Sequence, residues 1–223
     1  MKNETPKLIV MLTENDLTVD NAEEVFSQCS DSEVEYWGMK EKPLPKETMK
    51  HLFSEMKKAG KTTFLEVVGY TEDEGLKGAE LAKECGCDIL MGTKFHKSIS
   101  DYCAKSGIKY MPFVGTIIGR PSVLKGTITD IIEEAKKAIN NGAYGIDLLA
   151  YRYTEDPMEL SQALINEIDA PVCMAGSVDS FQRLEEVKEL NPWAFTIGSA
   201  FFNNKFGETF RGQVELVNEY MNS

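Results

Sequence analysis

The sequence has 223 residues, 42% of them hydrophobic, and a formal net charge of −12 at pH 7. This length suits one core, so we expect residues 1–223 to form a single domain. The acidic balance argues against nucleic acid and anionic membranes as partners. The first apolar run, residues 8–12, is too short for a signal peptide or a membrane span. Five cysteines, an odd number, fit reduced thiols, and we expect a cytoplasmic protein without metal or cofactor.

Short apolar runs alternate with amphipathic stretches along the chain. Runs rich in Val, Ile, Leu, Phe and Tyr predict strands at residues 7–12, 33–39, 62–69, 88–92, 109–114, 145–150, 171–175 and 194–198. Helical spacing predicts helices at residues 19–28, 46–59, 73–85, 98–106, 129–141, 157–168, 180–190 and 210–220. Eight strand–helix units predict an α/β fold, a closed parallel (β/α)8 TIM barrel, with an open doubly wound sheet as the alternative.

The longest connection follows the fifth predicted strand. Residues 115–129 contain Gly115, Gly119, Pro121 and Gly126, which predict a loop. Connections that follow a strand lie on the carboxyl-terminal face of a barrel, where barrel enzymes carry their chemistry. This segment is therefore interpreted either as a lid over a site or as a plain surface excursion.

Two Gly-Ser pairs end the last two predicted strands. Gly176 and Ser177 follow the seventh strand, and Gly198 and Ser199 follow the eighth. Glycine lets the backbone approach an anion closely, and backbone N–H groups and Ser hydroxyls can then bind it. Barrels often hold a phosphate at this place, so the pairs predict a phosphate site. The alternative is that both are tight turns.

The segment PVCMAGSVDSFQRLEEVKELNPWAFTIGSAFF, residues 171–202, resembles the ribulose-phosphate-binding barrel superfamily. That resemblance implies phosphate contacts from Gly176, Ser177, Gly198 and Ser199. The runs KTTFLEVVGYTE, GIDLLAYRYT and NPWAFTIGSAFF are similar to short bacterial barrels, some of which are labelled 4-hydroxythreonine-4-phosphate dehydrogenase. The enzyme of that name uses several His ligands and a nicotinamide, whereas this chain has two His residues and no G-x-G-x-x-G after a strand.

Ionisable residues stand in or just after four of the predicted strands. Glu35, Glu66, Lys94 and Asp147 are candidates for catalysis, because desolvation excludes charged groups from buried strands unless they are paired or functional. Lys94 could form a Schiff base, pair with an anion or lie on the surface. Glu66 and Asp147 could act as general base and acid, or pair with Lys94 or Arg152. The alternative for Glu35 is a buried salt bridge.

Three residues near the same face are candidates for substrate binding. Arg152 could hold a carboxylate or phosphate with both arms of its guanidinium, and Tyr151 could stack on a sugar. Arg120, in the long connection, is a second candidate for binding an anion. The alternative for these positions is a solvated loop.

Together these features predict an isomerase, epimerase or lyase that acts on a phosphorylated sugar or related metabolite. The metal-binding His and Asp residues of the epimerases, and the catalytic Lys and Glu patterns of other superfamily members, are missing, so no named activity carries over intact. The alternatives are a non-catalytic phosphosugar sensor and an oxidoreductase. The partner we expect is a small phosphorylated metabolite, and a homodimer is one option for assembly.

Overall fold

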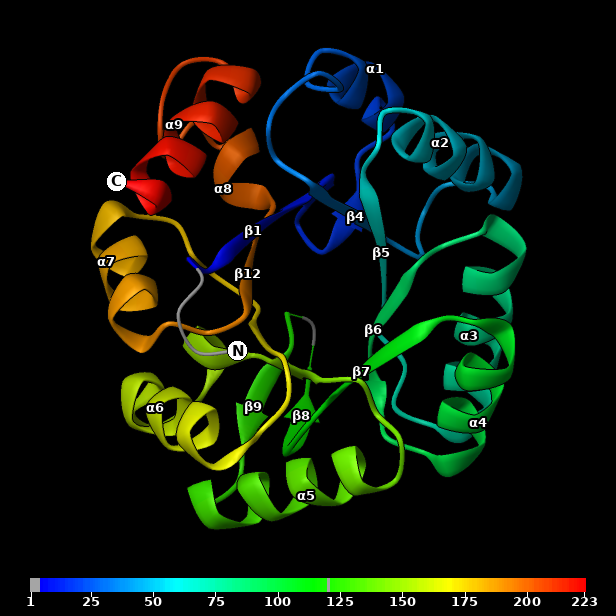
Figure 1. Ribbon diagram of the computed structural model, residues 1–223, viewed down its shortest axis with the longest axis vertical. Coiled ribbons are helices and arrows are strands. Elements are labelled where there is room, and N and C mark those ends of the chain that lie inside the picture. The colour runs from blue at the N-terminus through cyan, green and yellow to red at the C-terminus, as the bar shows by residue number, and fades with distance from the viewer. Residues whose placement is uncertain (1–4, 120) are drawn as a thin grey trace.

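The computed structural model describes residues 5–119 and 121–223 (Figure 1). Its central feature is a closed barrel of parallel strands in the order β1, β12, β11, β10, β7, β6, β5 and β4. The barrel strands are β1 (Lys7–Met11), β4 (Tyr36–Lys40), β5 (Thr62–Val67), β6 (Ile89–Lys94), β7 (Lys109–Phe113), β10 (Ile146–Leu148), β11 (Val172–Met174) and β12 (Ala194–Ile197). The predicted (β/α)8 barrel is confirmed.

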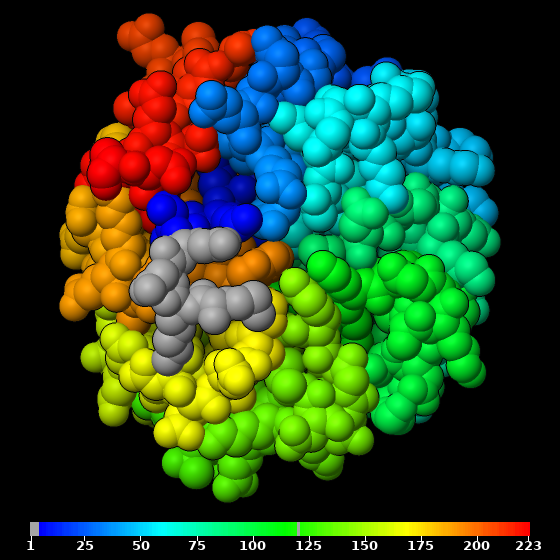
Figure 2. All heavy atoms as spheres, in the orientation of Figure 1, coloured from blue at the N-terminus to red at the C-terminus, as the bar shows by residue number. Residues whose placement is uncertain are grey.

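Helices surround the barrel, and every predicted helix has an observed counterpart. They are α1 (Ala22–Ser27), α2 (Lys46–Lys58), α3 (Glu72–Cys85), α4 (Lys97–Ser106), α5 (Ile128–Asn140), α6 (Pro157–Glu167), α7 (Phe181–Leu190), α8 (Ser199–Phe202) and α9 (Phe210–Asn222). The short helix α8 was not predicted. Figure 2 shows the segments following one another around the rim in sequence order, with the last segment beside the first. None of the described helices has the length and apolar character needed to cross a bilayer.

Local signals in the sequence explain where the helices begin and end. Helix α3 begins with a capping box, in which Thr71 and Glu74 each bind a backbone N–H of the other. It ends at Gly86, whose φ of 73° is the left-handed conformation that glycine adopts without steric cost. Helix α6 begins after Asp156, whose carboxylate accepts two backbone N–H groups.

The core has two parts, one inside the barrel and one between the strands and the helices. The inner part is apolar and is formed by Ile9, Met11, Phe64, Ile89, Met91, Met111, Cys173 and Ala194. Because strand residues alternate between two faces, Glu66 lies on the same face of β5 as Phe64. Asp147 pairs in register with the inward-facing Cys173. The apolar filling of the barrel therefore gives way to ionisable groups toward the carboxyl ends of its strands.

Two antiparallel hairpins rise from the carboxyl-terminal end of the barrel and were not predicted. One pairs β2 (Thr13–Glu14) with β3 (Leu17–Thr18), and the other pairs β8 (Thr116–Ile118) with β9 (Val123–Lys125). The second hairpin lies within the connection predicted as a loop. Its Leu124 is fully buried, and the Tyr153 hydroxyl donates a hydrogen bond of 2.7 Å to the carbonyl of Gly126. The described part of the connection therefore contains a hairpin that packs against the rest of the barrel through β9.

Candidate active site

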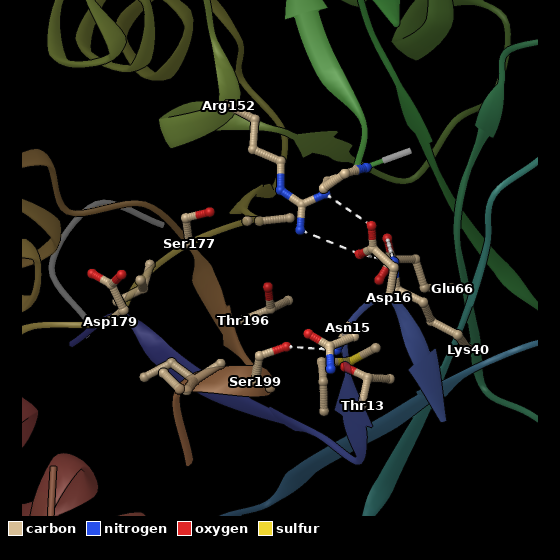
Figure 3. Close-up of a pocket in the computed structure, with 18 of the residues that line it drawn as sticks. Thr13, Asn15, Asp16, Lys40, Glu66, Arg152, Ser177, Asp179, Thr196 and Ser199 are labelled. Carbon is tan, nitrogen blue, oxygen red and sulfur yellow. Dashed lines mark hydrogen bonds and ion pairs between the residues drawn. The ribbon is translucent and has the colours of Figure 1, made fainter. Parts of the chain in front are cut away.

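A cavity of about 690 Å³ opens at the carboxyl ends of the barrel strands (Figure 3). Its lining comes from the ends of β1, β4, β5, β11 and β12, from the β2–β3 hairpin, and from the 3-10 turn η1 (Ala150–Arg152) that follows β10. The ionisable side chains of Asp16, Lys40, Glu66 and Arg152 gather on one side of the cavity, and Ser177, Thr196 and Ser199 lie on the other, together with the carboxylate of Asp179. The cavity thus has an ionic end and a hydroxyl-rich end.

Lys40 is the centre of the ionic end. Its ammonium lies 3.0 Å from a carboxylate oxygen of Asp16 and 3.2 Å from one of Glu66. Burial alone would lower the pKa of Lys40, but Glu66 and Asp16 outweigh burial and raise that pKa above its usual range. The amine is therefore held as a cation. A cation in this position stabilises nearby negative charge and is a poor nucleophile.

Arg152 reaches the same group from η1. Its Nη2 atom lies 3.2 Å from Oδ1 of Asp16, and its Nη1 atom donates to Oδ2 at 3.4 Å. Partial burial alone would raise the pKa of Asp16, but Lys40 and Arg152 together hold that pKa below its usual value. Asp16 therefore stays charged and links two cations that come from different elements, β4 and η1.

Asp147 lies buried beneath this group and is fully inaccessible to solvent. Neither of its carboxylate oxygens has a hydrogen-bond partner of normal geometry among the described residues. Burial raises the pKa of Asp147 well above its usual range, and the charge of Glu66 adds to that rise, against the opposing effects of Lys40 and Arg152. Asp147 therefore keeps its proton to a higher pH than an ordinary aspartic acid does.

The hydroxyl-rich end is built from the two Gly-Ser pairs. Gly176 and Ser177 both have positive φ, 83° and 64°, so the chain turns sharply where β11 ends. Ser199 begins α8, and its hydroxyl accepts a hydrogen bond of 3.1 Å from the backbone N–H of Asn15. A Cβ atom on Gly198 would lie 2.4 Å from the hydroxyl oxygen of Thr13, so a side chain there would clash with the end of β1.

Arg152 connects the two ends of the cavity. A Cβ atom on Gly176 would lie 3.0 to 3.2 Å from the Nε, Cδ and Cγ atoms of Arg152. The arginine stem thus crosses directly over the first Gly-Ser pair, while its guanidinium binds Asp16. Glycine at position 176 provides both the backbone turn and the space for this crossing.

The structure gathers most of the predicted site residues around one cavity. Its lining includes Glu66, Arg152, Gly176, Ser177, Gly198 and Ser199. Asp147 is not in the lining but lies close enough to Glu66 for their charges to interact. The roles predicted for these residues stay predictions.

Four predicted residues are not in this group. The amine of Lys94 binds Glu134 of α5 and the Gly115 carbonyl, outside the ring of strands. Glu35 precedes β4 at the opposite end of the barrel and accepts a hydrogen bond from Thr62. The Tyr151 ring packs under the guanidinium of Arg183 in α7 and does not line the cavity. Arg120 lies outside the described residues.

Two residues of the ionic end were not predicted from the sequence. Lys40 is the last residue of β4, one position beyond the predicted end of that strand. It lies an even number of residues after Tyr36, which packs against the inner core, so strand alternation would have directed it inward. Asp16 sits in the two-residue turn of the β2–β3 hairpin, and the adjacent Asn15-Asp16 pair is a turn signal that could have identified it.

Among the described residues, no three His, Cys, Asp or Glu side chains form a group that could hold a metal ion. Neither protein-family models nor curated proteins gave a significant match to the sequence. Many solved structures match in fold. One is described as a native KDPGal structure, with a TM-score of 0.72, 14% identity, and coverage of 100% of this chain and 99% of the other.

The second is N-acetylmannosamine-6-phosphate 2-epimerase from Clostridium perfringens, with a TM-score of 0.64, 13% identity, and coverage of 97% and 92%. The third is N-(5'-phosphoribosyl)anthranilate isomerase from Pyrococcus furiosus, with a TM-score of 0.64, 14% identity, and coverage of 98% and 100%. At these identities the similarity establishes the fold alone. The chain is therefore a (β/α)8 barrel that shares its architecture with barrels named for phosphorylated compounds.

Proposed function

We propose that the protein is an isomerase, epimerase or lyase that moves a proton next to a carbonyl group in a phosphorylated small molecule. One observation carries the proposal: the Glu66 carboxylate and the Lys40 ammonium lie 3.2 Å apart at one end of a cavity that has the two Gly-Ser pairs at its other end. The names of the structural neighbours supply the class of substrate, a phosphorylated small molecule.

In this proposal each end of the cavity has its own task. The Gly-Ser pairs bind the phosphate, through backbone N–H groups and the hydroxyls of Ser177 and Ser199. The Glu66 carboxylate takes a proton from the carbon beside the carbonyl, which leaves an enolate. Lys40, held as a cation by its two carboxylates, stabilises the negative charge that develops on the enolate oxygen. Return of the proton to the other face gives an epimer, and return to a different carbon gives an isomer.

Deuterium exchange tests this proposal. The protein is incubated in D2O with phosphorylated aldoses, ketoses and amino sugars, and loss of carbon-bound protons is followed by 1H NMR. We expect at least one compound to exchange the proton next to its carbonyl. Substitution of Glu66 by Gln removes the base at nearly constant volume, and we expect the exchange rate to fall by about 10²- to 10⁴-fold.

Glu35→Gln is the matched control, because Glu35 stands at the opposite end of the barrel. We expect it to exchange at the wild-type rate. Equal losses in the two variants would contradict a role for Glu66 in proton transfer. Compounds that bind through their phosphate but come back unexchanged and unchanged would instead support a metabolite sensor.

A further inference from the structure

We propose that Lys40 and Arg152 form a carboxylate-binding subsite, that Asp16 occupies this subsite in the free protein, and that the substrate replaces Asp16 with a carboxylate of its own. The inference rests on the proposed function and narrows its substrate class. The substrate is then a phosphorylated small molecule that also carries a carboxylate.

The contacts of Asp16 are those that a ligand carboxylate would make. Its Oδ1 atom lies 3.0 Å from the Lys40 ammonium and 3.2 Å from Nη2 of Arg152, while Oδ2 accepts from Nη1 at 3.4 Å. A guanidinium fork that binds both oxygens of one carboxylate is the preferred geometry for recognising that group. In the described part of the chain, Asp16 is the carboxylate that fills the Arg152 fork.

Asp16 also differs from its partners in the element that carries it. Lys40 and Glu66 belong to barrel strands, whereas Asp16 belongs to the two-residue turn of a hairpin with only two residue pairs. Asn15 and Asp16 both have positive φ, 50° and 64°, as a tight turn of this kind requires. The next residue, Leu17, is 43% exposed. Of the two carboxylates at the ionic end, Asp16 is therefore the one that a small backbone movement can withdraw.

The charges of the ionic end are balanced only while Asp16 is in place. Two cations, Lys40 and Arg152, face two carboxylates, Glu66 and Asp16, along the cavity wall. Withdrawal of Asp16 leaves one positive charge without a counter-charge in a partly enclosed space. A single ligand carboxylate restores the balance, which favours an anionic occupant over a neutral one.

The path of the Arg152 side chain fits one ligand with two anionic groups. Its stem crosses Gly176, in the first Gly-Ser pair, and its guanidinium reaches the subsite. The phosphate end and the carboxylate end are therefore joined by a single side chain along the cavity wall.

Matched pairs of ligands test the subsite by calorimetric titration of the full chain. The pairs are 3-phosphoglycerate with glycerol 3-phosphate, and 6-phosphogluconate with glucitol 6-phosphate. In each pair a carboxylate stands against a hydroxymethyl group on the same phosphorylated skeleton. In at least one pair we expect the carboxylate to bind at least about tenfold more tightly, the size of a charged hydrogen-bonded contact.

Two variants show whether the preference for a carboxylate depends on Asp16 and on the Arg152 guanidinium. Asp16→Asn removes the competing charge, and we expect the preference for the carboxylate to increase by about a further tenfold. Arg152→Met keeps the stem but removes the fork, and we expect the preference to disappear while glycerol 3-phosphate or glucitol 6-phosphate binds as before. Glu14→Gln, on the same hairpin, is the control for loss of one negative charge and should leave the preference unchanged. Should Asp16→Asn fail to fold, Asp16→Gly suits the positive φ and gives the same comparison.

Unphosphorylated ligands distinguish failure of this inference from failure of the proposed function. On Asp16→Asn, gluconate should bind and glucitol should not, and the addition of Arg152→Met should abolish gluconate binding. If gluconate behaves in this way and no phosphorylated alcohol binds, the proposed phosphate site is wrong and the proposed carboxylate subsite is supported. Phosphate-dependent binding with no carboxylate preference in Asp16→Asn would overturn the subsite alone. A loss of affinity that is equal for both members of a pair in Asp16→Asn would also overturn it, because Asp16 would then only support Arg152.

Discussion

Asp147 is a carboxyl group that the protein buries without a hydrogen-bond partner of normal geometry among the described residues. Because burial raises its pKa in the folded protein, the folded state keeps a proton that the unfolded chain releases above the ordinary Asp pKa of 3.8. The contribution of Asp147 to the free energy of unfolding therefore falls as pH rises from that value toward the raised pKa.

Replacement of Asp147 by Asn, which is neutral at every pH, should remove this dependence. We expect the variant to gain thermal stability relative to the wild type as pH rises from the ordinary Asp pKa of 3.8 toward the raised pKa of the folded state. Melting curves of both proteins at matched ionic strength measure the difference. A difference in midpoint that is constant across this range would show that Asp147 has the same charge in the folded and unfolded states.

The two lysines at the ends of β4 and β6 give a second comparison. Lys40 is buried between two carboxylates, whereas Lys94 is one-quarter exposed and binds Glu134 on the outer side of the barrel. We expect Lys40→Met to lower turnover by at least about 10²-fold and to destabilise the fold by roughly 3–5 kcal/mol, because it leaves the buried Glu66 carboxylate without the Lys40 cation. We expect Lys94→Met to cost at most about 1 kcal/mol and to keep most of the activity.

Turnover and denaturant unfolding of both variants check this expectation. Loss of activity in Lys94→Met at unchanged stability would instead support the role predicted for Lys94 from its place after a strand. The sequence could not separate the two lysines, because the contact that holds Lys94 comes from α5, forty residues away along the chain.

At the scale of elements, the barrel strands were predictable because each is a nearly continuous apolar run between turn residues. The helices were predictable from their spacing and from the glycines and capping residues that end or begin them. The hairpins were missed because strands of two or three residues are too short to show an alternating pattern. Asp16, one of the four charged groups at the ionic end, was missed together with its hairpin.

The turn after β11 carries a prediction of its own. Gly176 and Gly86 both have positive φ, so alanine at either position adopts an unfavourable backbone conformation that costs roughly 1–2 kcal/mol. A Cβ on Gly86 meets nothing within 4 Å, whereas one on Gly176 presses on the stem of Arg152. We expect Gly176→Ala and Gly86→Ala to be similarly destabilised, and only Gly176→Ala to weaken the binding of phosphorylated ligands.

Thermal melts and titrations of the two variants measure stability and affinity separately. Equal affinity in both would mean that Arg152 can shift without loss to the site. Weaker binding in Gly86→Ala would mean that affinity follows global stability.

At the scale of the whole molecule, the net charge and the cavity differ. The chain carries a charge of −12, whereas the cations that line the cavity, Lys40, Arg152 and Lys205, are matched in number by the carboxylates Asp16, Glu66 and Asp179. A small ligand responds to the local field of its pocket, so an acidic protein can still bind an anion. The absence of polyanionic partners stays a prediction from composition, and composition does not determine the charge of the small-molecule site.

Binding of a phosphorylated ligand should be visible as stabilisation of the whole barrel. A ligand at about 100 times its dissociation constant adds about 2.7 kcal/mol to the free energy of unfolding. For a chain of this size each kcal/mol raises the melting midpoint by roughly 2–4 °C. We expect phosphorylated metabolites to raise the midpoint, and their unphosphorylated counterparts, at equal concentration, to leave it nearly unchanged.

The double variant Ser177→Ala, Ser199→Ala locates the effect. Each hydroxyl lost from a phosphate contact should weaken binding by about tenfold or more, so the shift at fixed ligand concentration should shrink. Ser27→Ala, on the outer helix α1, is the control and should keep the full shift. If the double variant keeps the full ligand-induced rise in melting midpoint, the phosphate does not bind at the two Gly-Ser pairs. That outcome would not affect the fold, because the inner and outer cores stabilise the barrel without any ligand. It would contradict the part of the proposed function that assigns a phosphorylated substrate.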